Sequence, residues 1–177
     1  MASTQSQDKI LNYLEPQAKE AVQAFDALGT DEQLALLYYL YQKMGDSITP
    51  AAPTAADPNL SPTLLVHFYE LSDEQQLNTM RAIARREDTE HSRYYGALGE
   101  NNRLLVWYAW AQNMGNTVVD LPKDYQATSD SQNLLKKIEN LDFQEQISVL
   151  RAVAANMGYS DVKPIPTQEQ TGKTDSL

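Results

Sequence analysis

The sequence predicts a single all-α domain. Only 7 of its 177 residues are Gly, the helix formers Ala, Leu and Gln are plentiful, and the β-branched residues of sheet proteins are scarce. A chain of this length can bury about two-thirds of the surface that its unfolded form exposes, which is enough for one core. We expect an N-terminal arm with a first helix at residues 1–27, a helical core at 28–159 that packs with that helix, and a flexible tail at 160–177.

Three segments share a pattern that is typical of helix starts: ALGTDEQLALL at 27–37, ELSDEQQLNTM at 70–80 and NLDFQEQISVL at 140–150. Each contains a short polar turn, then acids and Gln, then an apolar run. We expect Thr30, Ser72 and Asp142 to be N-caps, because their side-chain oxygens can accept the free amides of the first turn. The acids that follow suit the positive end of the helix dipole.

Three helix ends are also alike. QKMG, QNMG and ANMG end at Gly45, Gly115 and Gly158, and Gly can adopt the left-handed conformation that closes a helix. Helices that begin and end alike indicate a bundle built from a duplicated helical unit. The alternative is chance use of common capping residues.

Two segments interrupt the helical pattern. Residues 45–62 contain four prolines, which a continuous helix does not tolerate, so we expect an extended connector there. Residues 116–130 form a second break, between the tryptophan-bearing helix and the last helix start. The segment after Tyr159 is polar and contains proline, which favours a mobile tail.

Charge and composition exclude several function classes. The chain carries 24 acids against 14 bases, a net charge of -10, so nucleic acid and anionic membrane surfaces are poor partners. It has no run of 18 apolar residues, no signal-peptide pattern at its start and no Cys. We therefore expect a soluble, cytoplasmic protein without an integral membrane segment or disulfides.

The sequence also lacks the usual signatures of enzymes. His67 and His91 lie 24 residues apart, outside any metal-ligand spacing, and no phosphate-binding glycine loop or nucleophile elbow is present. We expect no catalytic residue and no metal. Arg81, Arg85 and Arg86 form a small basic patch, which we interpret as a solvated face, with a docking surface as the alternative.

Aromatic and apolar side chains remain as candidate functional residues. The stretch RLLVWYAWAQNMG, residues 103–115, holds both tryptophans of the chain. One helical stripe contains Leu104, Trp107, Ala111 and Met114 beside Tyr108, and a second contains Leu34, Leu37, Tyr38, Tyr41 and Met44. Such stripes are commonly core. However, buried Tyr and Trp need hydrogen-bond partners, and flat faces with Met sulfurs also suit a pocket for a long conjugated ligand.

Four motifs carry a resemblance to a known family: DEQLALLYYLYQKMGDSITPAAP, LLVWYAWAQNMG, VVDLP and ISVLRAVAANMGY. In order and spacing they resemble the helical carotenoid-binding domain of the cyanobacterial orange carotenoid protein. The resemblance covers residues 28–159 and indicates a helical carotenoid protein, the stand-alone relative of that domain.

The resemblance implies two interleaved four-helix bundles with a keto-carotenoid, such as canthaxanthin or echinenone, threaded between them. The candidate pigment-binding residues, from the matched motifs and the two stripes, are Leu34, Leu37, Tyr38, Tyr41, Met80, Ile83, Leu104, Trp107, Tyr108, Ala111, Met114, Leu121 and Arg151. In the family, the residues that match Tyr41 and Trp107 hold one end ring of the pigment. The arginine that matches Arg151 faces the lid domain and has been tied to contact with the light-harvesting antenna.

The sequence departs from the family pattern at three positions. Tyr38 replaces a usual Trp and Pro50 a usual Ile, which affects the expected colour and pose of the pigment. Ala152 replaces an Asn beside Arg151, which affects antenna docking. Trp110, about 60° from Trp107 around the helix, is expected to be ordinary core.

The resemblance implies a photoprotective role without catalysis. We expect a carotenoid binder that quenches singlet oxygen or carries pigment and that does not photoswitch. The alternatives are a quencher that docks on the phycobilisome, which would place it at the thylakoid, and a ligand-free helical scaffold. Expected partners are the carotenoid, a lid-domain homologue as carotenoid donor and the phycobilisome, with the chain a monomer or a homodimer.

Overall fold

The computed structural model describes residues 11, 13–51 and 61–160. These residues contain eight α-helices and one 3-10 helix, and their only β-type pairing is an isolated bridge between Met114 and Val118. The elements are α2 (Pro16–Asp26), α3 (Thr30–Ala51), α4 (Pro62–Leu65), η2 (His67–Glu70), α5 (Asp73–Ala84), α6 (Glu90–Gly96), α7 (Glu100–Gln112), α8 (Ser129–Glu139) and α9 (Phe143–Ala155).

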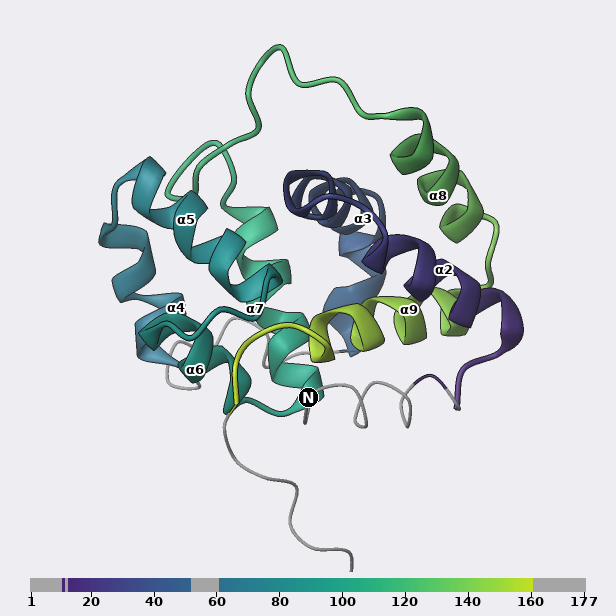
Figure 1. Cartoon of the computed structure of the whole chain (residues 1–177), viewed down its shortest axis with the longest axis horizontal. Helices are drawn as coiled ribbons and strands as arrows, with labels where there is room; N and C mark the ends of the chain where they lie inside the picture. The colour runs from purple at the N-terminus through teal and green to yellow at the C-terminus, as the bar shows by residue number, and fades with distance from the viewer. Residues whose placement is uncertain (1–10, 12, 52–60, 161–177) are drawn as a thin grey trace, which may run out of the picture.

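The helices form two four-helix bundles (Figure 1). We assign the helices to bundles by the side of the molecule on which Figure 1 shows them: α2, α3, α8 and α9 form one bundle, and α4, α5, α6 and α7 form the other. The chain builds half of the first bundle, then all of the second, and then returns to finish the first. Helices α3 and α9 pack against α7, so α7 joins the two bundles. The predicted all-α fold with two interleaved bundles is confirmed.

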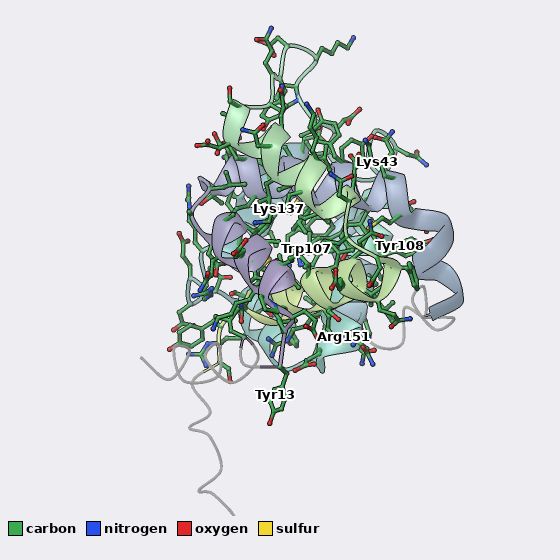
Figure 2. The ribbon with its side chains drawn as sticks, turned by 90° about the vertical axis from the view of Figure 1, so that its right-hand side faces the viewer. Tyr13, Lys43, Trp107, Tyr108, Lys137 and Arg151 are labelled. Carbon is green, nitrogen blue, oxygen red and sulfur yellow. The ribbon has the colours of Figure 1, made fainter. Side chains whose placement is uncertain are left out.

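Helix α7 lies at the centre of the molecule. Seven consecutive residues, 104–110, are buried, so the helix is covered on every side. Figure 2 shows Trp107 among the helices in the interior, whereas Tyr13 projects from the surface. The predicted apolar stripe is therefore one part of a helix that is buried all round.

Several predicted helix boundaries are confirmed. Ser72 caps α5 in a capping box with Gln75, and the Asp142 carboxylate accepts the Glu145 amide at 2.8 Å. Gly115 and Gly158 have φ angles of 81° and 83°, the left-handed conformation expected at these positions.

Two predicted boundaries are wrong. Thr30 is the first residue of α3 rather than its cap, because the helix starts directly after Gly29, whose carbonyl accepts the Gln33 amide. Gly45 does not close α3, which continues to Ala51. A single Gly costs a helix only about 1 kcal/mol relative to Ala, so it need not end one.

The predicted connectors have mixed outcomes. The extended connector predicted at 45–62 is wrong over residues 45–51, which continue α3. Residues 52–60 lie outside the described residues, and Pro62 begins α4, where its missing amide is tolerated. The second break ends at Thr128, which caps α8. Of the tail predicted at 160–177, residues 161–177 lie outside the described residues.

The basic patch joins helices of the two bundles. Arg81 contacts the Asp31 carboxylate through two nitrogens, at 2.8 and 3.0 Å, and Arg85 donates to the Thr30 hydroxyl at 3.1 Å. Arg86 donates to the Asn156 carbonyl. These arginines tie α5 to the start of α3 and the end of α9, in addition to facing solvent.

Candidate functional site

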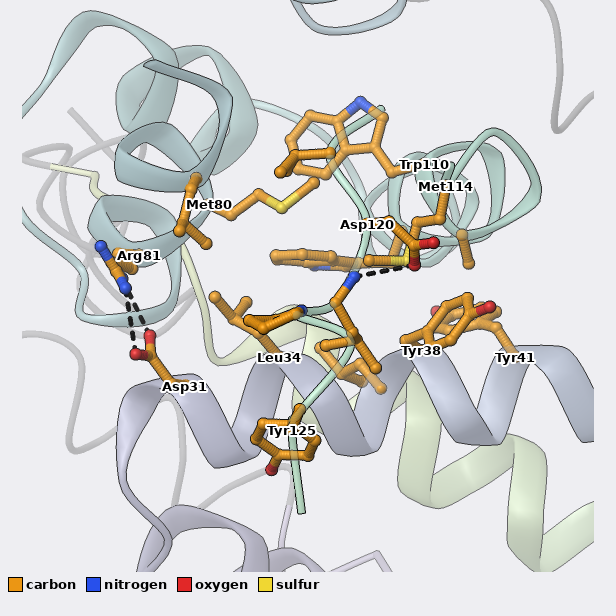
Figure 3. A pocket seen from close by; sticks show the side chains of 17 residues that line it. Asp31, Leu34, Tyr38, Tyr41, Met80, Arg81, Trp110, Met114, Asp120 and Tyr125 are labelled. Atoms are coloured by element: carbon orange, nitrogen blue, oxygen red, sulfur yellow. Dashed lines mark hydrogen bonds and ion pairs between the residues drawn. The ribbon is translucent and has the colours of Figure 1, made fainter. Parts of the chain in front are cut away.

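A cavity of about 310 Å³ lies between α3 of one bundle and α5 and α7 of the other (Figure 3). The irregular segment after α7 lines it through residues 119–122 and Tyr125. This volume falls at the lower end of the range for small-molecule pockets, about 300–1,000 Å³. The cavity is thus a site that neither bundle could form alone.

Nine of the thirteen candidate residues line the cavity: Leu34, Leu37, Tyr38, Tyr41, Met80, Trp107, Ala111, Met114 and Leu121. Eight further residues line it that were not candidates: Asp31, Leu77, Arg81, Trp110, Val119, Asp120, Pro122 and Tyr125. Leu77 follows from Met80 by helical periodicity, one turn earlier on α5. The residues of the irregular segment show no such periodicity in the sequence.

Three aromatic side chains of the wall have their polar atoms hydrogen-bonded inside the protein. The Tyr41 hydroxyl donates to the Leu104 carbonyl at 3.1 Å. The indole N–H of Trp107 donates to the Tyr95 hydroxyl at 2.8 Å, and that of Trp110 to the Leu64 carbonyl at 3.0 Å. With these groups satisfied, the rings can present apolar surface to the cavity.

Ring packing fixes both indoles. Trp110 stacks on Phe68 with centroids 4.2 Å apart, and Trp107 meets Trp110 edge-on at 5.1 Å. Trp110 is buried, as predicted, but the prediction that it is core alone is wrong because it also lines the cavity. The 60° rotation separates the two side chains, yet the cavity is wide enough to touch both.

Burial affects the pKa of two phenols in this region, Tyr41 and Tyr95. It raises the pKa of the Tyr41 hydroxyl well above its usual range. Burial also raises the pKa of the Tyr95 hydroxyl, although the hydrogen bond from Trp107 and the nearby Arg103 act in the opposite direction. Both side chains therefore remain neutral hydrogen-bonding groups at physiological pH.

The charges of the cavity lie at its edge, where Figure 3 shows Arg81 and Asp31 paired. The hydrogen bond from Arg81 holds the pKa of the Asp31 carboxyl below its usual range. Asp120 accepts the Leu121 amide at 2.7 Å. The Tyr125 hydroxyl is buried without a partner, and it points away from Leu34 and Trp110 (Figure 3).

Gln76 holds the irregular segment in place. Its side chain, 1% exposed, donates to the carbonyls of Thr117 at 2.8 Å and Phe68 at 3.2 Å, and accepts the Val119 amide at 2.8 Å. A buried amide with all these contacts positions the segment that covers the cavity. The sequence signal, a Gln in the first turns of a helix, is too common to have identified it.

Four candidate residues do not line the cavity. Ile83 and Leu104 are buried in the core, and Tyr108 packs beside the Tyr41 ring, with its hydroxyl accepting from Gln112 at 2.6 Å. Arg151 lies on α9 and is partly exposed, with a buried Nε that has no partner. The described residues contain no cluster of His, Asp or Glu suited to a metal ion. Nor does any helix among them have the length and apolarity needed to cross a membrane.

Comparison with known proteins gives consistent matches. Residues 12–160 match the family described as "Orange carotenoid protein, N-terminal". The chain is 43% identical over 138 residues to an orange carotenoid-binding domain-containing protein of Nostoc sp. strain PCC 7120, covering 77% of this chain and 81% of that protein. It is 31% identical to the orange carotenoid-binding protein of Synechocystis sp., covering 85% of this chain but only 50% of that protein.

A solved structure is similar over its full length. The Red Carotenoid Protein of Anabaena (Nostoc) sp. PCC 7120, solved binding canthaxanthin, superposes with a TM-score of 0.72 at 38% identity, covering 82% of this chain and 100% of that chain. The family is non-enzymatic. By profile, sequence identity and fold, the chain belongs to the family of orange carotenoid protein N-terminal domains, as a homologue of the stand-alone helical carotenoid proteins.

Proposed function

We propose that the chain binds a carotenoid in the cavity between α3, α5 and α7. The observation that carries this proposal is the chemistry of the wall. The hydrogen-bonding atoms of Tyr41, Trp107 and Trp110 are turned into the protein, which leaves ring faces for an apolar ligand. A long conjugated hydrocarbon offers no hydrogen bonds along its length, so such a wall fits it.

The side chains of the wall also suit the shape of the pigment. Trp107 and Tyr41, from different bundles, would hold an end ring, and the soft sulfurs of Met80 and Met114 would pack against the conjugated chain. Canthaxanthin in the similar Red Carotenoid Protein supports a keto-carotenoid as the ligand. Tyr38, at the position of a usual family Trp, gives a smaller ring in the same wall.

The proposed role is photoprotection. A bound carotenoid supplies the ability to take excitation from singlet oxygen and release it as heat. The chain would supply orientation and a dry, apolar environment, and it could also carry the pigment to other proteins. No side chain of the cavity needs to act as an acid, a base or a nucleophile.

Expression in carotenoid-producing cells tests the proposal. The purified protein should be orange to red and should shorten the near-infrared phosphorescence lifetime of singlet oxygen, whereas protein from cells without carotenoid should be colourless. A colourless product of normal thermal stability from the carotenoid-producing cells would contradict carotenoid binding. A coloured protein that leaves the lifetime unchanged would contradict the quenching role.

A further inference from the structure

Tyr95 lies on α6, outside the cavity, with 0% of its surface exposed. Its side chain bridges the Trp107 indole and the last turn of α9. We propose that Tyr95 is a positioning residue: it fixes the plane of the Trp107 ring in the cavity wall and ties that ring to the C-terminal end of α9. Its effect on a bound pigment rests on the proposed function, whereas its effect on the Trp107 ring does not.

The direction of each hydrogen bond follows from the groups involved. An indole N–H can only donate and a carbonyl can only accept, so the Tyr95 hydroxyl accepts from Trp107 at 2.8 Å and donates to Ala154 at 2.5 Å. The one phenolic proton is therefore used for Ala154, and within the described part of the chain the Trp107 indole N–H donates to Tyr95. The two rings also meet edge to face, with centroids 6.2 Å apart. Trp107 is 5% exposed, so an indole turned away from Tyr95 would not gain water in exchange.

Arg103 and Gly158 fix Tyr95 from its other sides. The Arg103 guanidinium lies 5.7 Å from the Tyr95 ring centre and donates to the carbonyls of Gly96 at 2.7 Å and Ala155 at 2.6 Å, which joins the ends of α6 and α9. Gly158 has a φ of 83°, and a Cβ there would lie 2.5 Å from Tyr95 Cδ1. A displacement at the end of α9 would therefore reach Trp107 through Tyr95.

Trp110 provides an internal reference. Its indole N–H donates to Leu64 on α4 and its ring stacks on Phe68, so it has no hydrogen bond to α6 or α9. The chain has only these two tryptophans. The two indole N–H groups therefore report separately on two different anchors of the same wall.

The first test uses the apoprotein labelled with 15N at the indole nitrogens, which should give two N–H cross-peaks that Trp110→Phe assigns. Tyr95→Phe should shift the Trp107 cross-peak and speed its exchange with deuterium by about tenfold, because the N–H loses its acceptor. The Trp110 cross-peak should shift less, through its edge-on contact with Trp107, and its exchange rate should stay unchanged because the Leu64 carbonyl still accepts its N–H. Tyr94→Phe is the matched control, since Tyr94 lies on the same helix with 46% of its surface exposed, and it should shift neither peak.

Gly158→Ala tests the link from the opposite side and keeps the proposal falsifiable if Tyr95→Phe does not fold. The added methyl group should push Tyr95 and shift the Trp107 cross-peak without contact with Trp107. An unmoved Trp107 peak in either folded variant would overturn the proposal. Equal changes of both peaks would overturn it too, since they would indicate general loosening of the core.

The second test uses the pigment-loaded protein. Tyr95→Phe should displace the visible absorption band while the amount of bound pigment stays close to that of the wild type. An unchanged band together with a shifted Trp107 peak would overturn the link from Tyr95 to the pigment. A wild type that binds no carotenoid would instead contradict the proposed function, and the apoprotein test would still decide the role of Tyr95.

Discussion

Two cavities of similar size lie where the bundles meet, and they differ in chemistry. The cavity between α3, α5 and α7 measures about 310 Å³, and a second, of about 360 Å³, lies where the ends of α2, α5 and α9 meet the start of α3. The wall of the first is mainly aromatic and aliphatic. The second contains Asp26, Arg85, Arg86 and the buried amide of Asn156.

The two cavities differ in whether the buried polar atoms around them have hydrogen-bond partners. In the first, Tyr41, Trp107 and Trp110 direct their donors into the protein. In the second, the Asn156 side chain is 8% exposed and its Nδ2 has no partner. A polar cavity with an unsatisfied donor favours ordered water, whereas a mainly apolar wall favours an apolar ligand. Similar volumes therefore lead to different expected occupants.

The largest effect is expected from removal of a wall residue of the apolar cavity. Trp107→Ala should lower the free energy of unfolding by roughly 3 to 5 kcal/mol and should reduce pigment occupancy, because it removes a buried ring from the wall. Urea denaturation and the ratio of visible to ultraviolet absorbance measure the two effects. Trp107→Phe is the control and should lose less of both, because a flat ring remains. Wild-type occupancy and spectrum in Trp107→Ala would show that this residue is not part of the pigment site.

An intermediate effect distinguishes the two buried amides. Gln76→Leu should destabilise the protein by roughly 2 to 3 kcal/mol, because the Thr117 carbonyl and Val119 amide lose their partner and the segment over the apolar cavity is released. Asn156→Leu should change stability by less than about 1 kcal/mol, since it removes an amide whose Nδ2 is already unpaired. Thermal melts of both variants provide the measurement. Equal losses of stability in the two variants would mean that the hydrogen bonds of Gln76 do not make it more important to the fold than Asn156.

The smallest effect concerns the charged edge of the apolar cavity and depends on pH. The Asp31 pKa is lowered in the folded protein, so its pairing with Arg81 stabilises the fold above the usual pKa of the carboxyl, and this stabilisation is lost as pH falls through the lowered pKa. Asp31→Asn should lower stability at neutral pH by at most about 1 kcal/mol, since the pair is solvent-screened. The difference in melting temperature from wild type should disappear in strong acid. A difference that persists there would assign the effect to packing.

Local rules predicted much of the fold. Ser72, Asp142, Gly115 and Gly158 act as the sequence indicates, because capping depends on a few neighbouring residues. Gly45 shows the limit of such rules, since Gly permits a helix end but does not impose one. The assignment of helices to two bundles came from the family resemblance, and contacts between distant segments could not have been read from local patterns.

The candidate site was predicted best where residues lie on helices. Tyr38, Tyr41 and Trp107 line the cavity because helical periodicity places them on the facing sides of α3 and α7. Tyr95 and Gln76 were not predicted, because their roles consist of hydrogen bonds to residues distant in sequence. The position of Trp110 was misjudged because the rotation along a helix does not reveal how wide the adjoining cavity is.

The assignment of the pigment to the apolar cavity is tested by placing the same charge in each cavity. Ala111 and Ala84 are both half-buried alanines, one in the wall of the apolar cavity and the other beside Arg85 and Arg86 in the polar cavity. The measurement is the amount of carotenoid bound per protein when Ala111→Glu, Ala84→Glu and wild type are purified from the same carotenoid-producing strain.

We predict that Ala111→Glu loses at least about 90% of the pigment, since a tenfold loss requires only about 1.4 kcal/mol and an unpaired carboxylate in an apolar site costs more than that. Ala84→Glu should keep wild-type occupancy. Normal occupancy in Ala111→Glu, or loss confined to Ala84→Glu, would contradict the assignment of the pigment to the cavity between α3, α5 and α7.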